Sequence, residues 1–301
     1  LGVLSCEAAE QETRTLTDAN GREVELNEDI QKAIVSNRYN LEIIRAVGAI
    51  DQVEAIDSLA YTNEAFWPEF TSDDVYGKGT RDLDYEKIIS YNPDIFIVLP
   101  GQYSDEMAEK LGDYNIPVFV LNCASGQTVE EYNEQIELCA EIFGKKEGAE
   151  RVIDFCSSIR SEVAERLKDM PEEDRVNVYL EYYDAYTTCF GNESSWGQMI
   201  NQAGGHNVIE SDMQVEDSDY ADAEAVINSN PDVVIKTVYR DQKDGIMADN
   251  YLPPEEADYT FAKEEMKSRE GFSKMKAIED DNIIMCSDFC LRGGGNTVGL
   301  A

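Results

Sequence analysis

The chain has 301 residues, and its 25 Lys and Arg against 62 Asp and Glu give a formal net charge of −37. A surface this acidic repels phosphate backbones and argues against nucleic acid as a partner. With 42% hydrophobic residues the chain is globular and long enough for two domains. It contains no stretch approaching the ~20 apolar residues of a membrane span.

The first six residues, LGVLSC, look like the end of a bacterial lipoprotein signal peptide. Apolar Val3 and Leu4 and small Ser5 precede Cys6, which is the pattern at which a cysteine becomes lipidated. We therefore expect residues 1–15 to be a signal remnant and tether, and the protein to be extracytoplasmic and lipid-anchored to the cell membrane. The alternative is an accidental cysteine near the terminus.

The next segments alternate between strand and helix patterns. Residues 15–26 predict a hairpin turned by Asn20-Gly21. Apolar runs predict strands at 33–35, 53–56, 75–76 and 117–121, and helical patterns cover 41–48, 105–111 and 129–143. This alternation predicts a mostly parallel, doubly wound sheet.

One pattern occurs twice. Residues 85–98 read YEKIISYNPDIFIV, and residues 223–236 read AEAVINSNPDVVIK. In each copy a short amphipathic helix is ended by an Asn-Pro-Asp turn and followed by a buried strand. The repeat predicts two similar α/β lobes with a ligand cleft between them.

Between the lobes, residues 146–169 keep a helical apolar period. A helix of this length would be about 35 Å long and would stiffly connect the lobes. We therefore expect an N-terminal lobe at 16–145, a linking helix at 146–170 and a C-terminal lobe at 171–301. In the second lobe the patterns predict strands at 176–182 and 282–286 and helices at 196–203 and around 264–267.

The chemistry-bearing residue types exclude several classes of site. The single histidine, His206, follows a predicted helix end and rules out a histidine-rich metal cage and most Ser–His or Cys–His hydrolase schemes. The cysteines form no CxxC pair or zinc ladder, and no disulfide is assigned. The glycine runs 77–79 and 293–295 lack nucleotide-loop spacing. Residues 293–295 precede a predicted helix, so we expect either an anion site or a flexible loop there.

Candidate ligand residues come from the predicted carboxyl ends of the strands, where doubly wound sheets bind ligands. Arginine and aromatic residues recur there, and they suit a bulky ligand that carries negative charge. Local salt bridges with the abundant acids are the alternative explanation for the arginines. The candidates are Arg38, Tyr39, Tyr61, Trp67, Arg81, Tyr103, Tyr183, Tyr186, Trp196, Tyr239, Arg240 and Arg292.

From about residue 15 to the C-terminus, the chain resembles the class III substrate-binding proteins of ABC importers for ferric siderophores, haem and cobalamin. The resemblance rests on the segments TDANGREVEL, SNRYNLEIIRAVGA, DLDYEKIISYNPDIFIV, FGNESSWGQMINQAGGHNVI, SNPDVVIK and GGGNTVGLA. The family fold, two α/β lobes joined by one long helix, agrees with the expectation from the residues. The resemblance also implies that Glu86 and Glu193 dock onto arginines of a membrane permease.

The resemblance implies a non-enzymatic protein, expected to be a monomer without a cofactor, whose ligand is a ferric chelate, haem or a corrinoid. A molybdate-type oxyanion is one alternative, because some relatives bind it. A two-lobed chelatase or nitrogenase-like metalloenzyme is another. It would need cluster-ligating cysteines, for which Cys123, Cys189, Cys286 and Cys290 are the candidates. A purely adhesive surface module would bind no small molecule.

Overall fold

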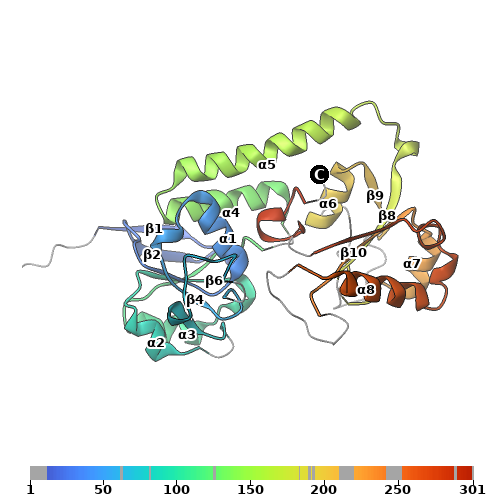
Figure 1. The fold of residues 1–301 in the computed structure, drawn as a ribbon. Coiled ribbons are helices and arrows are strands. Elements are labelled where there is room, and N and C mark those ends of the chain that lie inside the picture. Colours follow the sequence, from blue (N-terminus) through green and yellow to red (C-terminus); the bar gives the residue numbers. More distant parts are fainter. Residues whose placement is uncertain are drawn as a thin grey trace, which may run out of the picture.

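The computed structural model describes residues 12–61, 64–80, 83–124, 127–182, 184–188, 191, 194–209, 220–241, 253–287 and 290–299. These residues form two α/β lobes, each built on its own parallel sheet (Figure 1). No helix in these ranges is long and apolar enough to cross a membrane.

The N-terminal lobe contains a five-stranded sheet with the strand order β5-β4-β3-β6-β7, and every neighbouring pair is parallel. Its strands are β3 (Ala33–Val35), β4 (Val53–Asp57), β5 (Val75–Gly77), β6 (Ile95–Val98) and β7 (Val118–Val120). The strands agree with the predicted positions to within one or two residues at each end. Both faces of the sheet are buried, which explains the short runs of consecutive apolar residues in β3 and β6.

Helices cover both faces of this sheet. Side chains of α1 (Arg38–Val47), α4 (Val129–Ile142) and the start of α5 (Lys146–Leu167) form the core on one face. Side chains of α2 (Tyr85–Ser90) and α3 (Asp105–Gly112) form the core on the other face. The predicted hairpin is present as antiparallel β1 (Thr13–Thr17) and β2 (Glu23–Asn27), and Gly21 takes a positive φ of 76° at the turn.

The C-terminal lobe contains a four-stranded parallel sheet with the order β11-β10-β8-β9. Its elements are β8 (Val176–Glu181), α6 (Ser195–Gln202), β9 (Gly205–Asn207), α7 (Ala223–Ser229), β10 (Val233–Thr237), α8 (Glu256–Ser268), α9 (Lys276–Glu279) and β11 (Ile283–Cys286). His206 follows the end of α6, as expected, and lies in the edge strand β9, where it pairs with Asn177 of β8.

The linking helix α5 runs along both lobes (Figure 1). It has 22 residues, which corresponds to about 33 Å of helix. Its N-terminal part packs on α1, where Gly148 is buried directly against the backbone of Val47. Farther along, α5 contacts α6 of the second lobe. One helix, Lys146–Leu167, therefore contacts both lobes.

Candidate ligand-binding site

In the C-terminal lobe, β8 is the first strand of the sheet, and its neighbours β9 and β10 lie on opposite sides of it. The carboxyl ends of β8 and β10 therefore form a topological switch point, the usual ligand position in such sheets. The first residues beyond these ends include Tyr182 and Tyr239. Their hydroxyl oxygens are 3.1 Å apart, and their ring centroids are 6.4 Å apart.

Trp196 and Arg292 complete an aromatic cluster with these two tyrosines. Trp196, in the first turn of α6, packs 5.0 Å from Tyr182, and its indole N–H donates to the carbonyl of Leu291 at 3.3 Å. The guanidinium of Arg292 lies 4.3 Å from the Tyr182 ring centroid and 5.8 Å from that of Trp196. The cluster thus holds a cation against two aromatic faces.

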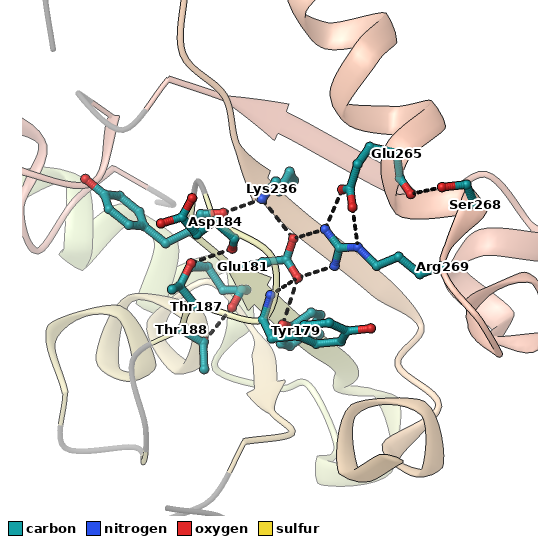
Figure 2. Close-up of polar contacts among 12 residues, drawn as sticks. Tyr179, Glu181, Asp184, Thr187, Thr188, Lys236, Glu265, Ser268 and Arg269 are labelled. Atoms are coloured by element: carbon teal, nitrogen blue, oxygen red, sulfur yellow. Dashed lines mark hydrogen bonds and ion pairs between the residues drawn. The ribbon is translucent and has the colours of Figure 1, made fainter. Parts of the chain in front are cut away.

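A buried polar network lies at the carboxyl end of β8, around Glu181 (Figure 2). Glu181, the last residue of β8, is the direct partner of Lys236 in β10, and both side chains are buried. The Lys236 ammonium lies 2.8 Å from the Glu181 carboxylate and donates to the carbonyl of Tyr182 at 2.6 Å. Arg269, the C-cap residue that follows α8, donates two further bonds to Glu181, at 2.6 and 2.9 Å. The network therefore fixes the backbone where β8 enters the cluster.

The electrostatics of the network keep it charged. Burial opposes ionisation of Glu181, but hydrogen bonds from Arg269 and the charge of Lys236 outweigh burial and lower the pKa of this carboxyl. Burial raises the pKa of Tyr179, whose hydroxyl donates to Glu181 at 3.0 Å, and the negative charge of Glu181 adds to this effect. Glu181 is therefore an acceptor shared by several donors, as a buried carboxylate requires.

The N-terminal lobe has its own switch point between β3 and β6. Arg38 and Tyr39 lie there in the first turn of α1, which is capped by the Asn37 side chain. Both are buried, and Arg38 donates to the Tyr39 hydroxyl at 2.7 Å. A Cβ atom built on Gly293 would lie 3.1 Å from the Tyr39 ring. Because Gly293 follows Arg292 directly, the chain brings residues of both switch points to one place.

The remaining described candidates have other surroundings. Trp67 is fully buried in the N-terminal core, and its expected contact with ligand stays a prediction. Tyr61 donates to Glu64, and Tyr103 packs under Arg22 of the hairpin. Tyr186 packs edge-on against Phe272, on the other face of the C-terminal sheet from Trp196. Arg240 pairs with Glu255, the alternative that local salt bridges predict.

Five predicted residues, Cys6, Arg81, Tyr183, Cys189 and Glu193, lie outside the described residues. Glu86 is described and is exposed in the first turn of α2, beside a surface hollow of about 810 Å³ that Lys78 and Lys87 also line. Its position leaves the carboxylate accessible to a partner, and its docking role stays a prediction.

Within the described ranges, no group of three or more His, Cys, Asp or Glu side chains could hold a metal ion. Cys123 is fully buried in the N-terminal core, and burial raises the pKa of its thiol well above the ordinary value. Such a thiol is unreactive and a poor cluster ligand as it stands.

Sequence reasoning missed Tyr182, Glu181 and Lys236. A signal for Lys236 exists, because a lysine inside the apolar run of β10 must meet a buried partner. Glu181 is the second-last residue of the predicted strand 176–182, and in the sheet it lies directly beside Lys236. Tyr182 stands one residue before the candidate Tyr183, so the error is one of register at the strand end.

Residues 34–288 match the family described as periplasmic binding protein. The chain belongs to this family. The periplasmic binding proteins of this kind are the extracytoplasmic substrate-binding components of ABC transporters, so the chain acts in transport with a permease and a small-molecule ligand.

Individual relatives of this periplasmic binding protein differ in what they bind. An uncharacterized ABC transporter substrate-binding lipoprotein, YvrC of Bacillus subtilis, is 24% identical over 89% of this chain and 76% of its own length. The molybdate-binding protein MolA of Haemophilus influenzae is 23% identical over 93% of this chain and 79% of its own length. These identities leave the ligand open.

Solved structures agree on the fold. The structure of MolA bound to molybdate superimposes with a TM-score of 0.71 at 20% identity, covering 95% of this chain and 89% of that one. The petrobactin-binding protein YclQ of Bacillus subtilis gives 0.69 at 15% identity, covering 96% and 95%. The two-lobed architecture predicted from the repeat is therefore confirmed.

Proposed function

We propose that this binding protein captures an anionic metal compound, and that Arg292 contacts the negative charge of that ligand. The observation that carries the proposal is the Arg292 guanidinium held over the Tyr182 ring at the β8/β10 switch point. Tyr39 of the other lobe lies beside the next residue of the chain, Gly293. A guanidinium at this position, in a chain with a net charge of −37, favours an anion as the ligand.

The exposure of the aromatic residues bears on the ligand class. Tyr182, Trp196 and Tyr239 are only 7%, 2% and 6% exposed, because they pack against one another. They present little ring surface on which a haem or a corrinoid could stack. Recognition through charge is better supported, and a ferric siderophore with negative groups on its periphery is our first candidate.

A molybdate-type oxyanion is the second candidate. The guanidinium of Arg292 and the phenolic hydroxyls at both switch points are donors suited to the oxygens of a small dianion. The similarity to MolA over most of both chains supports this alternative.

The delivery step follows from the family. We propose that Glu86 and Glu193 dock onto the permease of the same importer and that Cys6 carries a lipid anchor. The exposure of Glu86 supports its docking role, and the name of YvrC as a lipoprotein supports the anchor. We propose that the protein acts as a monomer and needs no cofactor of its own.

A binding titration tests the proposal. The protein is titrated by calorimetry with a ferric trihydroxamate, a ferric tricatecholate, haem, cobalamin and sodium molybdate. We expect saturable binding of a ferric chelate or of molybdate. Arg292→Ala should weaken that binding about 10- to 100-fold, since a hydrogen bond to a charged group contributes about 1.5–3 kcal/mol. Arg166→Ala, an exposed change on α5, is the control and should bind like wild type. Absence of saturable binding to every probe would overturn the proposal.

A further inference from the structure

The chain after β11 joins the two lobes a second time. Leu291 is fully buried in the C-terminal core, and its carbonyl accepts the indole N–H of Trp196. The next residue, Arg292, lies against the aromatic cluster. The next residue, Gly293, is already bound to the N-terminal lobe, because its N–H donates to the carbonyl of Ala124 at 3.0 Å and its carbonyl accepts the hydroxyl of Tyr132. We call residues 292–297 the C-terminal strap.

The strap fits the N-terminal lobe closely. Gly293 has a positive φ of 52°, and a Cβ atom there would collide with the carboxylate of Glu42. That carboxylate accepts the N–H of Gly294 at 2.8 Å. The sequence led us to expect either a ligand anion site or a flexible loop at this glycine run. The structure shows neither, because the Glu42 carboxylate of α1 occupies the position that an anion would take.

Two more contacts hold the end of the strap. Asn296 is fully buried, and its amide donates to Gln127 at 3.4 Å. Arg160 of α5 donates to the hydroxyl of Thr297 at 3.1 Å. The strap is therefore bonded to the N-terminal lobe and to the linking helix, although it follows the last strand of the C-terminal sheet.

We propose that Tyr132 and Glu42 are positioning residues for Arg292, so that the N-terminal lobe sets the place of the ligand-binding arginine on the C-terminal lobe. The backbone of Arg292 is held on one side by Leu291 in the C-terminal core and on the other by Gly293 in the N-terminal lobe. If the contacts of Gly293 with the N-terminal lobe are lost, the backbone of Arg292 is fixed only through Leu291. The average position of the guanidinium over Tyr182 then shifts. This inference rests on the proposed role of Arg292 in ligand binding.

A double-mutant cycle tests the inference. Tyr132→Phe removes one hydroxyl, and with it the bond to the Gly293 carbonyl, without changing the packing of the ring. For the probe that binds wild type, Tyr132→Phe should raise the Kd about threefold to tenfold, the range of one lost hydrogen bond. In the Arg292→Ala background the same change should leave the Kd within about twofold, because coupled residues are not additive.

Tyr91→Phe is the matched control. Its hydroxyl also donates to a backbone carbonyl of the N-terminal lobe, that of Asp73, and Tyr91 has no part in the strap. It should leave the Kd unchanged in both backgrounds. An unchanged Kd for Tyr132→Phe, or an equal loss with and without Arg292, would overturn the proposal.

A measurement without ligand separates this proposal from the proposed function. The two tryptophans are labelled with 5-fluorotryptophan and followed by ¹⁹F NMR. Trp196 contacts Leu291 and Arg292, so its resonance should shift in Tyr132→Phe, while that of Trp67, buried in the N-terminal core, stays as a reference. If no probe binds wild type, the proposed function fails. A shifted Trp196 resonance then still supports the positioning role, and an unshifted one overturns it.

Discussion

Replacement of Glu181 by Gln should strongly destabilise the C-terminal lobe. The change keeps the shape of the side chain but leaves the fully buried Lys236 and the nearly buried Arg269 without their shared counter-charge. At 2.8 Å and an effective dielectric constant of about 20, one such pair attracts by about 6 kcal/mol. Desolvation offsets part of this attraction. Because breaking a buried pair leaves an uncompensated charge, we expect the free energy of unfolding to fall by about 3–5 kcal/mol.

Urea denaturation at pH 7, followed by the intrinsic fluorescence of Trp67 and Trp196, measures this loss. Glu265→Gln is the matched control, because it removes a carboxylate from the same Arg269 at a position where the side chain is 39% exposed. Glu265→Gln should lower the free energy of unfolding by less than about 1 kcal/mol. If Glu181→Gln stayed within 1 kcal/mol of wild type, the network would not stabilise the fold and our account of it would be wrong.

Three further predictions concern pH, packing and docking. The pKa of Glu181 is lower in the folded state than in the unfolded state. Its stabilisation of the fold is therefore fully present above the unfolded-state pKa of about 4.3, and it is lost as the pH falls through the folded-state pKa. The stability gap between wild type and Glu181→Gln should therefore be constant from pH 7 to about 5 and shrink below about 4.3 in urea titrations. Gly148→Ala should lower the free energy of unfolding by about 1–3 kcal/mol, measured by thermal or urea unfolding. The reason is that the new Cβ would collide with the Val47 carbonyl and lie 2.7 Å from the carbonyl carbon. Gly112→Ala, which has open space, should not be destabilising. Glu86→Lys should abolish cellular uptake and leave the Kd of the purified protein for its ligand unchanged. The control Glu224→Lys, at the equivalent place of the second repeat, should transport normally. Uptake by Glu86→Lys at the wild-type rate would contradict the docking role.

Most of the fold could be predicted because its helices, turns and strands are specified by short segments of the sequence. The Asn-Pro-Asp turns end α2 and α7 where the proline rule places the break, and the apolar runs of β6 and β10 follow at once. The linking helix follows from one uninterrupted apolar period. The edge strand β9 escaped prediction because its three residues, Gly205–Asn207, carry no strand pattern. They form a strand through pairing with β8, which a single-sequence pattern does not contain.

The candidate site was less predictable, because its decisive contacts join distant parts of the chain. Strand ends can be found from sequence, and Trp196, Tyr239 and Arg292 all contact Tyr182, the first residue beyond β8. Their contact with ligand stays a prediction. Which arginine faces ligand and which meets an acid is set by tertiary neighbours, and Arg240 meets Glu255.

The strap is the strongest case of such a long-range contact. Glu42 and Gly294 are 252 positions apart, and no local pattern in either segment indicates the other. Their bond nevertheless decides what the glycine run does. A backbone N–H at a glycine turn attracts an anion, and a protein with 62 acidic residues can supply that anion from its own α1. The position that looked like a ligand subsite in the sequence is thereby used to join the lobes.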